Sequence, residues 1–559
     1  MAPVANHESD CLPIPGELSV KVDCLPFNQI PHTSKLFLDF LSYTPKVRPF
    51  YAYPPNISDW LTRQTPAQRY DSARRQRVSD TLDRQNRSWN AGAKSLANIE
   101  RLRAGASAVV TGQQVGLFGG PLFSLLKALT AVKLAEEATA AGVDCIPIFW
   151  LATNDHDLEE VNHVTIPGPD GLRTIATPSR GIEDAPVGTV SFGPEIEEVV
   201  KSVIDLLGPV PAIDLVRESY RPGESLGSAF ARLFAGLFGE FGVVLMDPSD
   251  AEFHAIAQPI YTAAIEHAQE IDEALLVRGR ALESAGYHQQ VKVTPSSTLL
   301  FTLKYGARIP IHRRVNGSDA TSEFLIKDEK LSKEQLLQRI AQRPDDFSPN
   351  VLLRPIVQDH LLPTLAYTGG SAEVAYFAQV GVVYEKLLGQ VTPIVPRFSA
   401  TIVEPKPKLL LERYGLKLTD AFHGDDALRE KVAASTLPAE LQTAFDRAAR
   451  TLEQSFTGVR DALGRLDKTL VEAADNATSK MQHQLETLRA RAARAELRQS
   501  EIVGRHAQQL SNSLFPNKVL QEREIGAIYF LARFGVEFLQ TLYNTLQPGC
   551  HDHQVVTFD

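Results

Sequence analysis

Residues 107–157 constrain the fold of this chain more than any other segment. An apolar run from Ala106 to Val110 leads into the turn T-G-Q-Q-V-G-L-F-G-G, and a helical pattern begins near Pro121. A second apolar run, Cys145 to Leu151, ends in N-D-H-D. Strand, crossover helix and strand make a βαβ unit, which places two parallel strands in one sheet. Polar residues follow both strands, at the edge where open parallel sheets bind ligands.

Later segments predict more of the same α/β architecture. Residues 225–241 have the pattern of an amphipathic helix leading into a strand at 243–246, and residues 348–380 read as helix, strand, Gly-Gly turn and helix. A doubly wound parallel sheet needs such alternation. We also expect a helix over 250–285, a polar helix over 328–343, and short strands at 163–166, 188–192, 290–293, 298–302 and 309–312.

Residues 425–512 differ in kind from the rest. Apolar residues recur at alternating spacings of four and three, as in the a/d seam of a coiled coil, and continue after a one-step phase shift. The pattern predicts a long coiled-coil helix, paired either with a C-terminal helix over 519–546 or with a second copy of the chain. The seam residues are Leu452, Phe456, Val459, Leu463, Leu466, Leu470, Ala473 and Ala477, then Met481, Leu485, Leu488, Ala492 and Ala495.

Composition excludes several classes of protein. The net charge of −10 disfavours non-specific binding to nucleic acid. The chain shows neither the pattern of a signal peptide nor a run of 18 apolar residues, so we expect a cytoplasmic protein without a membrane span. Four widely spaced cysteines without a C-x-x-C pair indicate reduced thiols.

The first candidate site is the glycine-rich turn. Gly112 and Gly116, with Gly119 and Gly120, let the backbone approach a ligand, and the following helix N-terminus favours an anion. Gln113 and Gln114 supply amides for phosphate, carboxylate or sugar hydroxyls. Lys127 lies about two turns into the helix, but no G-K-[ST] phosphate loop is present. A tight packing turn is the alternative.

The second candidate site is Asn154-Asp155-His156-Asp157. A histidine between carboxylates can be held in one tautomer, act as acid or base, or contact a phosphate. A metal site built from His156, Asp157 and His163 is an alternative, although the spacing matches no recognised motif. A surface acidic turn, which Glu159 extends, is the plainest reading.

The third candidate site lies at 354–376. Arg354, Gln358 and Asp359 share one helical face, and Arg354 could hold a carboxylate bidentately or form a structural salt bridge to Asp359 or to another acid. Gly369 and Gly370 form a second strand-to-helix turn that could be the other wall of the cleft; Glu373 and Tyr376 follow it.

Other residues carry weaker signals. Asp247 is a site residue or a helix cap, and Lys292 and Lys304 are weak anion-site candidates on predicted strands. Cys145 reads as core. Cys550, His551 and His553 could bind metal, but a solvated tail is the expected structure.

Four motifs make the chain resemble one family, the BshC cysteine-adding enzymes of bacillithiol synthesis. They are T-G-Q-Q-V-G-L-F-G-G-P-L-F-S-L-L-K-A, F-W-L-A-T-N-D-H-D-L-E-E-V-N-H, L-L-R-P-I-V-Q-D-H-L-L-P-T-L-A-Y-T-G-G-S-A-E-V-A-Y-F and L-F-P-N-K-V-L-Q-E-R. Members commonly carry Glu where this chain has Asn154. The resemblance implies a Rossmann-like core over 1–157, 225–265 and 346–410, connecting segments inserted at 158–224 and 266–345, and a coiled-coil domain over 411–559 that dimerises.

The resemblance also implies a reaction: joining the cysteine carboxyl to the amine of glucosaminyl-malate. A carboxylate must be activated before an amine attacks it, so we expect ATP with Mg²⁺ and no tightly bound metal. In this hypothesis His156 contacts phosphate or shuttles a proton, Asp155 or Asp157 orients it, and Arg354 holds the malate carboxylate. Nucleotidyl or glycosyl transfer on the same core, or a non-catalytic dimeric nucleotide-binding scaffold, are the rival readings.

Overall fold

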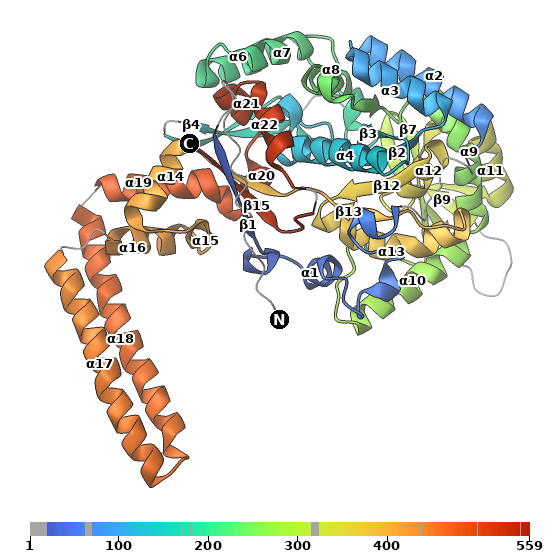
Figure 1. Ribbon diagram of the computed structural model, residues 1–559. Helices are drawn as coiled ribbons and strands as arrows, with labels where there is room; N and C mark the ends of the chain where they lie inside the picture. The colour runs from blue at the N-terminus through green and yellow to red at the C-terminus, as the bar shows by residue number, and fades with distance from the viewer. Residues whose placement is uncertain are drawn as a thin grey trace.

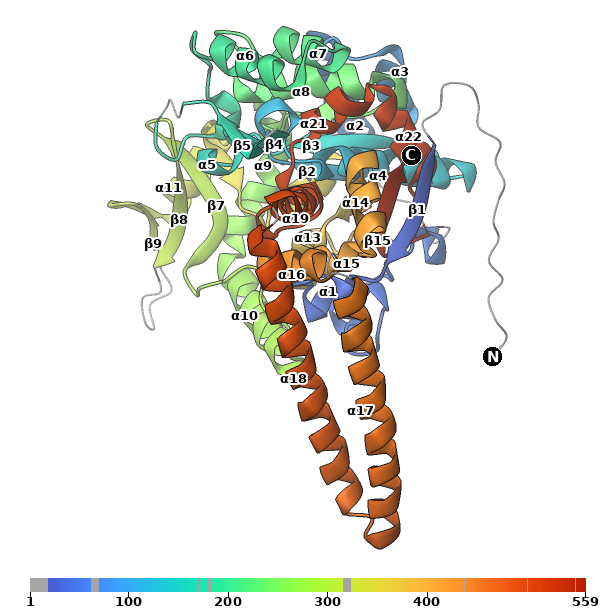
Figure 2. The ribbon, with the colours of Figure 1, turned by 90° about the vertical axis from the view of Figure 1, so that its left-hand side faces the viewer.

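The computed structural model describes residues 19–61, 70–168, 170–178, 182–314, 323–435, 439–499, 501–547 and 549–559. A rounded body of helices and sheets carries a two-helix arm that projects away from it (Figure 1, Figure 2). Within the described residues, no helix combines the length and the apolar character needed to cross a membrane.

A parallel five-stranded sheet forms the centre of the body, in the order β13-β12-β2-β3-β6. In chain order the central strand β2 comes first, β3 and β6 follow on one side of it, and β12 and β13 are added later on the other side. The switch point between β2 and β12 is therefore the expected ligand crevice. The predicted Rossmann-like core is confirmed, with strands β2 (Ser107–Gln113), β3 (Cys145–Leu151), β6 (Val244–Met246), β12 (Thr364–Gly369) and β13 (Ile394–Pro396).

Helices cover both faces of this sheet, which explains why its strands read as continuous apolar runs. All seven residues of β3 are buried, and successive side chains point into different cores. Ile148 and Trp150 belong to the first core, whereas Phe149 and Leu151 belong to the second. The first core includes α2 (Ser72–Ser88), α3 (Ala93–Ala104), α9 (Ala251–Glu266), α10 (Ala268–Ser284), α12 (Arg354–Leu361) and α13 (Ser371–Leu387). The second includes α4 (Phe123–Ala140), α6 (Ile196–Leu207), α7 (Pro211–Ser219) and α8 (Leu226–Phe238).

An antiparallel sheet between β6 and β12 packs beside the first core. Its order is β10-β9-β8-β7-β11, with strands β7 (Ser297–Lys304), β8 (Ala307–Arg314), β9 (Glu323–Ile326), β10 (Glu329–Ser332) and β11 (Phe347–Pro349). The strands predicted at 298–302 and 309–312 are confirmed. Helix α11 (Lys333–Gln342) follows β10, so the polar helix predicted over 328–343 is shorter than expected.

Three local predictions in the connecting segments are wrong. Residues 290–293 form bends rather than a strand, and the helix expected over 250–285 is broken at His267 into α9 and α10. Residues 187–189 form a 3₁₀ turn where a strand was expected. A Cβ on Gly188 would lie 2.4 Å from the Cβ of Thr153, so the close approach of these two segments sets the local backbone. The strand predicted at 163–166 is confirmed as β4 (His163–Gly168), which pairs with β5 (Gly171–Ala176).

A third sheet joins both ends of the described chain. β15 (His553–Phe558) lies between β1 (Val20–Leu25) and β14 (Ala400–Val403). The prediction of a solvated C-terminal tail is therefore wrong. His553 is fully buried, with Nδ1 2.7 Å from Ser399 Oγ and Nε2 2.8 Å from Thr401 Oγ1.

The coiled coil is confirmed, but as a hairpin rather than one long helix. α17 (Ala439–Leu466) and α18 (Leu470–Gln499) lie side by side in both views (Figure 1, Figure 2). Asp467 Oδ1 accepts hydrogen bonds from the Thr469 amide and hydroxyl, both at 2.8 Å, and this Asx turn separates the helices. The seam read across residues 452–477 therefore spans two helices. The base of the arm comprises α14 (Pro405–Tyr414), α15 (Leu418–Ala421), α16 (Asp425–Ser435) and α19 (Glu501–Leu514).

The predicted C-terminal helix over 519–546 is also wrong, and with it the pairing of that helix with the arm. The segment forms α20 (Gln521–Glu524), α21 (Ala527–Phe534) and α22 (Glu537–Thr545). Gly535 has φ of 79°, which ends α21, and α21 and α22 pack on the second core of the body.

Candidate functional site

The carboxyl ends of β2, β3 and β12 open into a cavity of about 620 Å³ at the switch point of the sheet. The antiparallel sheet and the C-terminal segment supply its other walls. Of the predicted site residues, Gly112, Gln113, Gln114, Asn154, Asp155, His156, Arg354 and Gly370 line the cavity; Gly116, Asp157, Gln358, Asp359 and Gly369 do not.

Gln114 ties the two strand ends of the first site together. Its Nε2 donates to Asp155 Oδ2 and to Glu160 Oε2, each at 2.7 Å. Gly112 sits against β3 so closely that a Cβ would lie 3.0 Å from the Trp150 carbonyl oxygen. The turn after β2 thus joins the first and second sequence sites into one wall.

The remaining glycines of the turn serve packing. A Cβ on Gly116 would lie 2.8 Å from the Gly120 Cα, and Gly119 and Gly120 have φ of 90° and 69°. The amides of all three donate to carbonyl oxygens within the turn. They are therefore not available to hold a phosphate.

His156 is held from the far side of the cavity. Nη1 of Arg308, on β8, lies 3.2 Å from His156 Nδ1. A guanidinium only donates, so Nδ1 accepts and the ring proton is on Nε2. Asp155 Oδ1 is 3.6 Å from the same Nδ1 and accepts from the His156 amide at 2.8 Å. The side chain that fixes this histidine is thus an arginine, which the sequence analysis did not single out.

Arg308 is itself firmly placed. Its Nε donates to Ser348 Oγ at 3.0 Å, its Nη2 to the Pro349 carbonyl at 2.6 Å, and its guanidinium carbon lies 3.9 Å from the centre of the Phe301 ring. Burial lowers the pKa of Arg308 to about 10, and the nearby charge of Asp155 opposes that shift. Arg308 therefore remains charged at neutral pH.

The other residues around His156 have structural roles. Asp157 is exposed and caps α5 (Leu158–Val161), where its Oδ1 accepts from the Glu160 amide at 3.2 Å. His163 Nδ1 lies 2.9 Å from the Glu159 carbonyl oxygen. Over the described residues, no three His, Cys, Asp or Glu side chains converge as a metal site would require.

A buried ion pair crosses the floor of the cavity. Lys127 Nζ lies 2.8 Å from Glu373 Oε2 and donates to the Gly112 carbonyl at 2.8 Å and Gln113 Oε1 at 2.9 Å. Burial lowers the pKa of Lys127 to about 8, although Glu373 counteracts it. Tyr367 donates to Glu373 Oε1 at 2.6 Å. The pair fastens the end of β2 to the first turn of α13.

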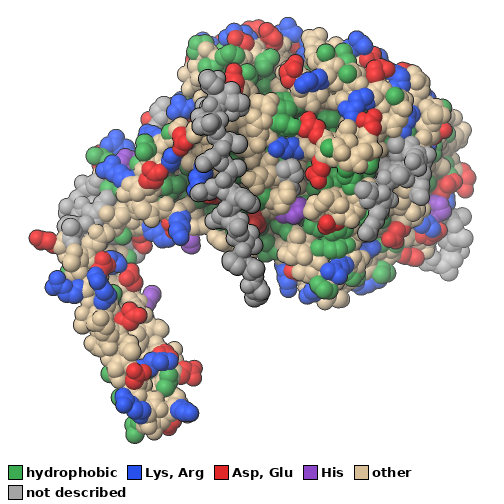
Figure 3. Space-filling model, viewed as in Figure 1, with side chains coloured by type: hydrophobic (Ala, Val, Ile, Leu, Met, Phe, Trp, Pro, Cys, Tyr) green, Lys and Arg blue, Asp and Glu red, His purple; other side chains and the backbone are tan. Residues whose placement is uncertain are grey.

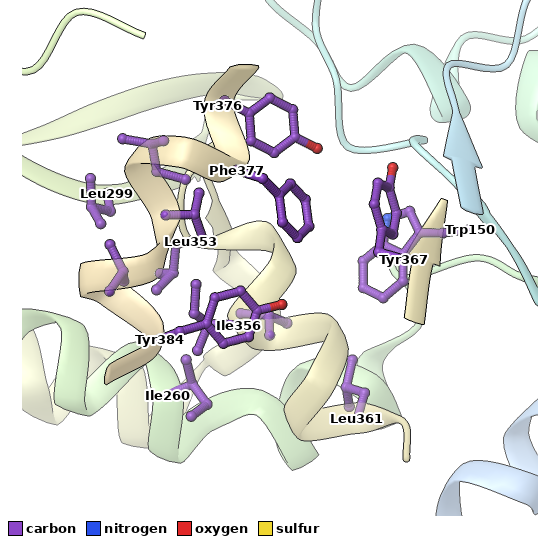
Figure 4. Close-up of a cluster of buried hydrophobic side chains, with 14 of the residues drawn as sticks. Trp150, Ile260, Leu299, Leu353, Ile356, Leu361, Tyr367, Tyr376, Phe377 and Tyr384 are labelled. Carbon is purple, nitrogen blue, oxygen red and sulfur yellow. The ribbon is translucent and has the colours of Figure 1, made fainter. Parts of the chain in front are cut away.

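Arg354 lies over an aromatic surface. Its guanidinium carbon is 4.9 Å from the centre of the Tyr367 ring and 5.9 Å from that of Trp150, and its Nη2 donates to Tyr376 at 2.9 Å. Figure 4 shows Tyr376 and Phe377 projecting from α13 beside Tyr367. Gln358 Oε1 accepts a hydrogen bond from Arg354 at 2.9 Å, which confirms the prediction that these two residues share one face of the helix.

Asp359 and Gly369 support the wall from behind. Gln358 Nε2 donates to Asp359 Oδ1 at 2.9 Å, and burial raises the pKa of Asp359. A Cβ on Gly369 would lie 2.7 Å from the Glu373 Cβ. Arg354 is therefore not paired with Asp359, and its charge faces the cavity.

The weaker candidates are placed elsewhere. Asp247 is half-buried and does not line the cavity; it accepts a hydrogen bond from Thr153 at 2.5 Å, and desolvation raises its pKa. Lys304 pairs with Glu329 at 2.8 Å on the antiparallel sheet. Lys292 does not lie on a strand. Cys145 is buried in β3, which confirms it as a core residue.

Two further arginines of the lining come from the C-terminal part of the chain. Arg397 follows β13, and Arg523 lies on α20 within the motif L-F-P-N-K-V-L-Q-E-R. Together with Lys127, Arg308 and Arg354 they give the lining five cationic side chains, against the three acidic ones of Asp155, Glu160 and Glu373. The cavity is suited to an anionic ligand, although the chain as a whole is acidic.

Comparison with known proteins agrees with this architecture. Residues 20–398 match the family model "Bacillithiol biosynthesis BshC, N-terminal Rossmann-like domain", and residues 400–558 match "Bacillithiol biosynthesis BshC, C-terminal coiled-coil domain". A relative named "Putative cysteine ligase BshC" from Koribacter versatilis is 49% identical over 96% of this chain and 99% of its own length. Proteins of the same name from Solibacter usitatus and Salinibacter ruber are each 35% identical, over 95% and 93% of this chain and 99% and 96% of their own lengths.

Proposed function

This chain belongs to the BshC family, and on that premise we propose that it is a carbon–nitrogen ligase that joins the carboxyl group of cysteine to the amine of glucosaminyl-malate. The observation that carries the proposal is His156, held by Arg308 with its proton on Nε2, in a cavity whose lining is rich in arginine. Both substrates carry carboxylates, and an excess of fixed cations would bind them.

Amide formation needs an activated carboxyl group. We propose that a cysteine carboxylate oxygen attacks a phosphorus of ATP, which releases pyrophosphate and leaves an acyl adenylate, or releases ADP and leaves an acyl phosphate. The neutral amine then attacks the acyl carbon, the carbon–oxygen bond to phosphate breaks, and the amine proton passes to solvent. This step expels AMP from an acyl adenylate or inorganic phosphate from an acyl phosphate.

In this scheme the Nε2–H of His156 donates to an oxygen that gains negative charge. A fixed donor of this kind costs no reorganisation during reaction, which is why such groups contribute strongly to catalysis. Arg308 occupies Nδ1, so a donor role suits the ring better than proton uptake. Asp155 and Glu160, both bound to Gln114, are the carboxylates that would hold Mg²⁺ accompanying ATP, and Mg²⁺ would neutralise phosphate charge.

The remaining cations would orient the substrates. Arg354 has its acidic neighbours satisfied by other groups and lies over Tyr367, so its charge is available to a malate carboxylate. The buried pair of Lys127 and Glu373 fixes the distance between β2 and α13 and so the width of the cavity.

The decisive test is mass spectrometry of purified protein with cysteine and glucosaminyl-malate, with and without Mg-ATP. Product that forms only with ATP supports the proposal, and release of AMP or ADP identifies the intermediate. His156→Ala should lose activity while its melting temperature stays near that of the wild type. ATP cleavage without a need for cysteine would favour nucleotidyl transfer instead, and ATP binding without turnover would favour a scaffold.

We further propose that the arm joins two copies of the chain. Apolar side chains are exposed along it, with Val459 46%, Met481 43%, Leu488 55% and Leu466 78% accessible. Figure 3 shows acidic and basic side chains interspersed along the arm. Leu488→Glu should convert a dimer to a monomer in light scattering. Lys480→Glu, about two turns away on the same helix, changes the charge without apolar loss and should have a smaller effect. A monomeric wild-type chain would contradict this proposal.

A further inference from the structure

The Gly-Gly turn after β12 presents the first turn of a long helix to the cavity. Helix α13 has 17 residues, Gly370 is its N-cap, and Gly370 and Ala372 line the cavity. The Gly370 amide donates to Glu373 Oε2 at 2.7 Å, which completes that part of the cap. The amides of Ser371 and Ala372 belong to the first turn, whose N–H groups have no acceptor within the helix.

A buried arginine with an unused donor faces this turn. The side chain of Arg397 is only 4% exposed, and its two terminal nitrogens donate to Glu522 at 2.7 and 3.0 Å. Its Nε is buried without a hydrogen-bond partner. A buried charged donor without a hydrogen-bond acceptor is costly, so such a group indicates a missing acceptor.

Gly370 leaves space in front of that donor. A Cβ built on Gly370 would lie 3.3 Å from Arg397 Nε and 3.7 Å from Glu373 Oε2. Its φ of −82° and ψ of −176° are open to any residue, so the backbone does not require glycine here. Glycine at this position therefore does not relieve backbone strain. Its missing side chain leaves room for a ligand atom.

Arg523 closes the same space from α20. Its Nη2 is 3.4 Å from Ser371 Oγ, a weak contact, and its guanidinium carbon lies 5.9 Å from the centre of the Phe123 ring. Across the described part of the chain, no carboxylate lies within the 4.0 Å that defines an ion pair with Arg523. The nearby acids are already committed: Glu373 to Lys127 and Glu522 to Arg397.

We propose that an oxyanion group of a substrate, a carboxylate or a phosphate, binds between the first turn of α13, Arg397 Nε and Arg523. Three kinds of donor converge there: helix amides, a buried guanidinium N–H and a charge without a partner. Together they match the geometry by which proteins hold carboxylate and phosphate oxygens. The identity of the substrate rests on the function proposed above, but the subsite does not.

The position suits one end of a bound substrate. β12 and β3 lie on either side of β2, so their ends are separated by two strand spacings, roughly 10 Å. A substrate anchored at α13 can therefore present a second group near His156. The oxyanion bound at α13 and the group that reacts near His156 can therefore be different parts of the same substrate.

The test uses the full chain and two probes that need no turnover, inorganic phosphate and L-malate, in isothermal titration calorimetry. The wild type should bind at least one of them. Arg523→Gln should weaken that binding roughly tenfold or more, as loss of one charged hydrogen bond does. Gly370→Ala should weaken it without any change of charge, because the new Cβ fills the space before Arg397 Nε. Arg280→Gln, exposed on α10, is the matched control and should bind as the wild type does.

The two sources of the oxyanion separate by probe and by kinetics. If only phosphate binding falls, with a raised KM for ATP, the subsite holds a nucleotide phosphate. If only malate binding falls, with a raised KM for glucosaminyl-malate, it holds an acceptor carboxylate. Wild-type protein that binds neither probe, or binding unchanged in both Arg523→Gln and Gly370→Ala, overturns the subsite. Because calorimetry needs no reaction, failure of the ligase assay leaves this result standing.

Discussion

Arg308→Gln tests whether the antiparallel sheet contributes to catalysis through His156. The substitution removes the donor to His156 Nδ1 at 3.2 Å and leaves the histidine in its place after β3. A hydrogen bond from a charged group contributes about 1.5–3 kcal/mol. If that contribution fixes the reactive tautomer, kcat/KM should fall by roughly 10- to 150-fold, since 1.4 kcal/mol corresponds to tenfold.

Loss of activity alone would not separate positioning from folding. Arg308 also bonds Ser348 and Pro349, which attach β8 to β11, so some loss of stability is expected. The melting temperature and the separate values of kcat and KM distinguish the two effects. A folded variant that has lost only the positioning of His156 should show a lower kcat with little change in KM.

Two variants complete the experiment. Arg308→Lys retains a cation and should recover part of kcat. Arg314→Gln, on the same strand but in an exposed pair with Glu323, should leave kcat and KM unchanged. Arg308→Gln protein that remains folded, with kcat/KM within about twofold of the wild type, would refute the assigned role of Arg308.

Two other predictions concern stability. Glu522→Gln leaves the Arg397 guanidinium buried without its carboxylate, and removal of one member of such a pair costs about 3–5 kcal/mol. Urea denaturation should therefore show a marked loss of unfolding free energy. Glu524→Gln, on the same short helix, is the control and should lose much less. Burial lowers the pKa of His553 to about 4 from an ordinary value near 6.5, so its stabilising effect is complete above pH 6.5 and declines as the pH falls toward 4. That decline amounts to about 3 kcal/mol, and His553→Gln should reduce the difference in unfolding free energy between pH 7 and pH 4.5; an unchanged difference would contradict the assignment.

Local patterns were enough to predict the centre of the fold. Apolar strands followed by Gly, Gln, Asp and His fix the βαβ unit, and parallel strands must end at one edge, so Gln114 and Asp155 could be placed together from sequence. Arg354 was a candidate because a guanidinium can hold a carboxylate, and it lines the cavity. These residues lie within a few positions of a strand end or helix start, where local structure determines location.

Residues that reach the site through tertiary packing could not be found this way. Arg308 sits in A-R-I-P-I-H-R-R, an ordinary alternating strand, and only the docking of the antiparallel sheet brings it to His156. His553 looked solvated because its strand partners, β1 and β14, are distant in sequence. The arm was read as one helix because both halves of the hairpin supply apolar residues. The seam passes from Leu466 to Leu470 at a spacing of four, so the three-residue turn between these residues leaves the period uninterrupted.

The cavity depends on contacts between segments that are far apart in the chain, and this links its chemistry to the integrity of the whole body. Glu522 receives Arg397, the Ala400 amide and the Ser399 hydroxyl, so one carboxylate holds the end of β13, the start of β14 and α20 together. Burial alone would raise the pKa of Glu522, but Arg397 outweighs burial and lowers it to about 2, so the carboxylate stays charged at any physiological pH. The same guanidinium has one nitrogen left over, directed at the Gly-Gly turn. The pair that closes the fold thereby orients a donor toward the ligand, which explains how a charge with a full structural role can also belong to the site.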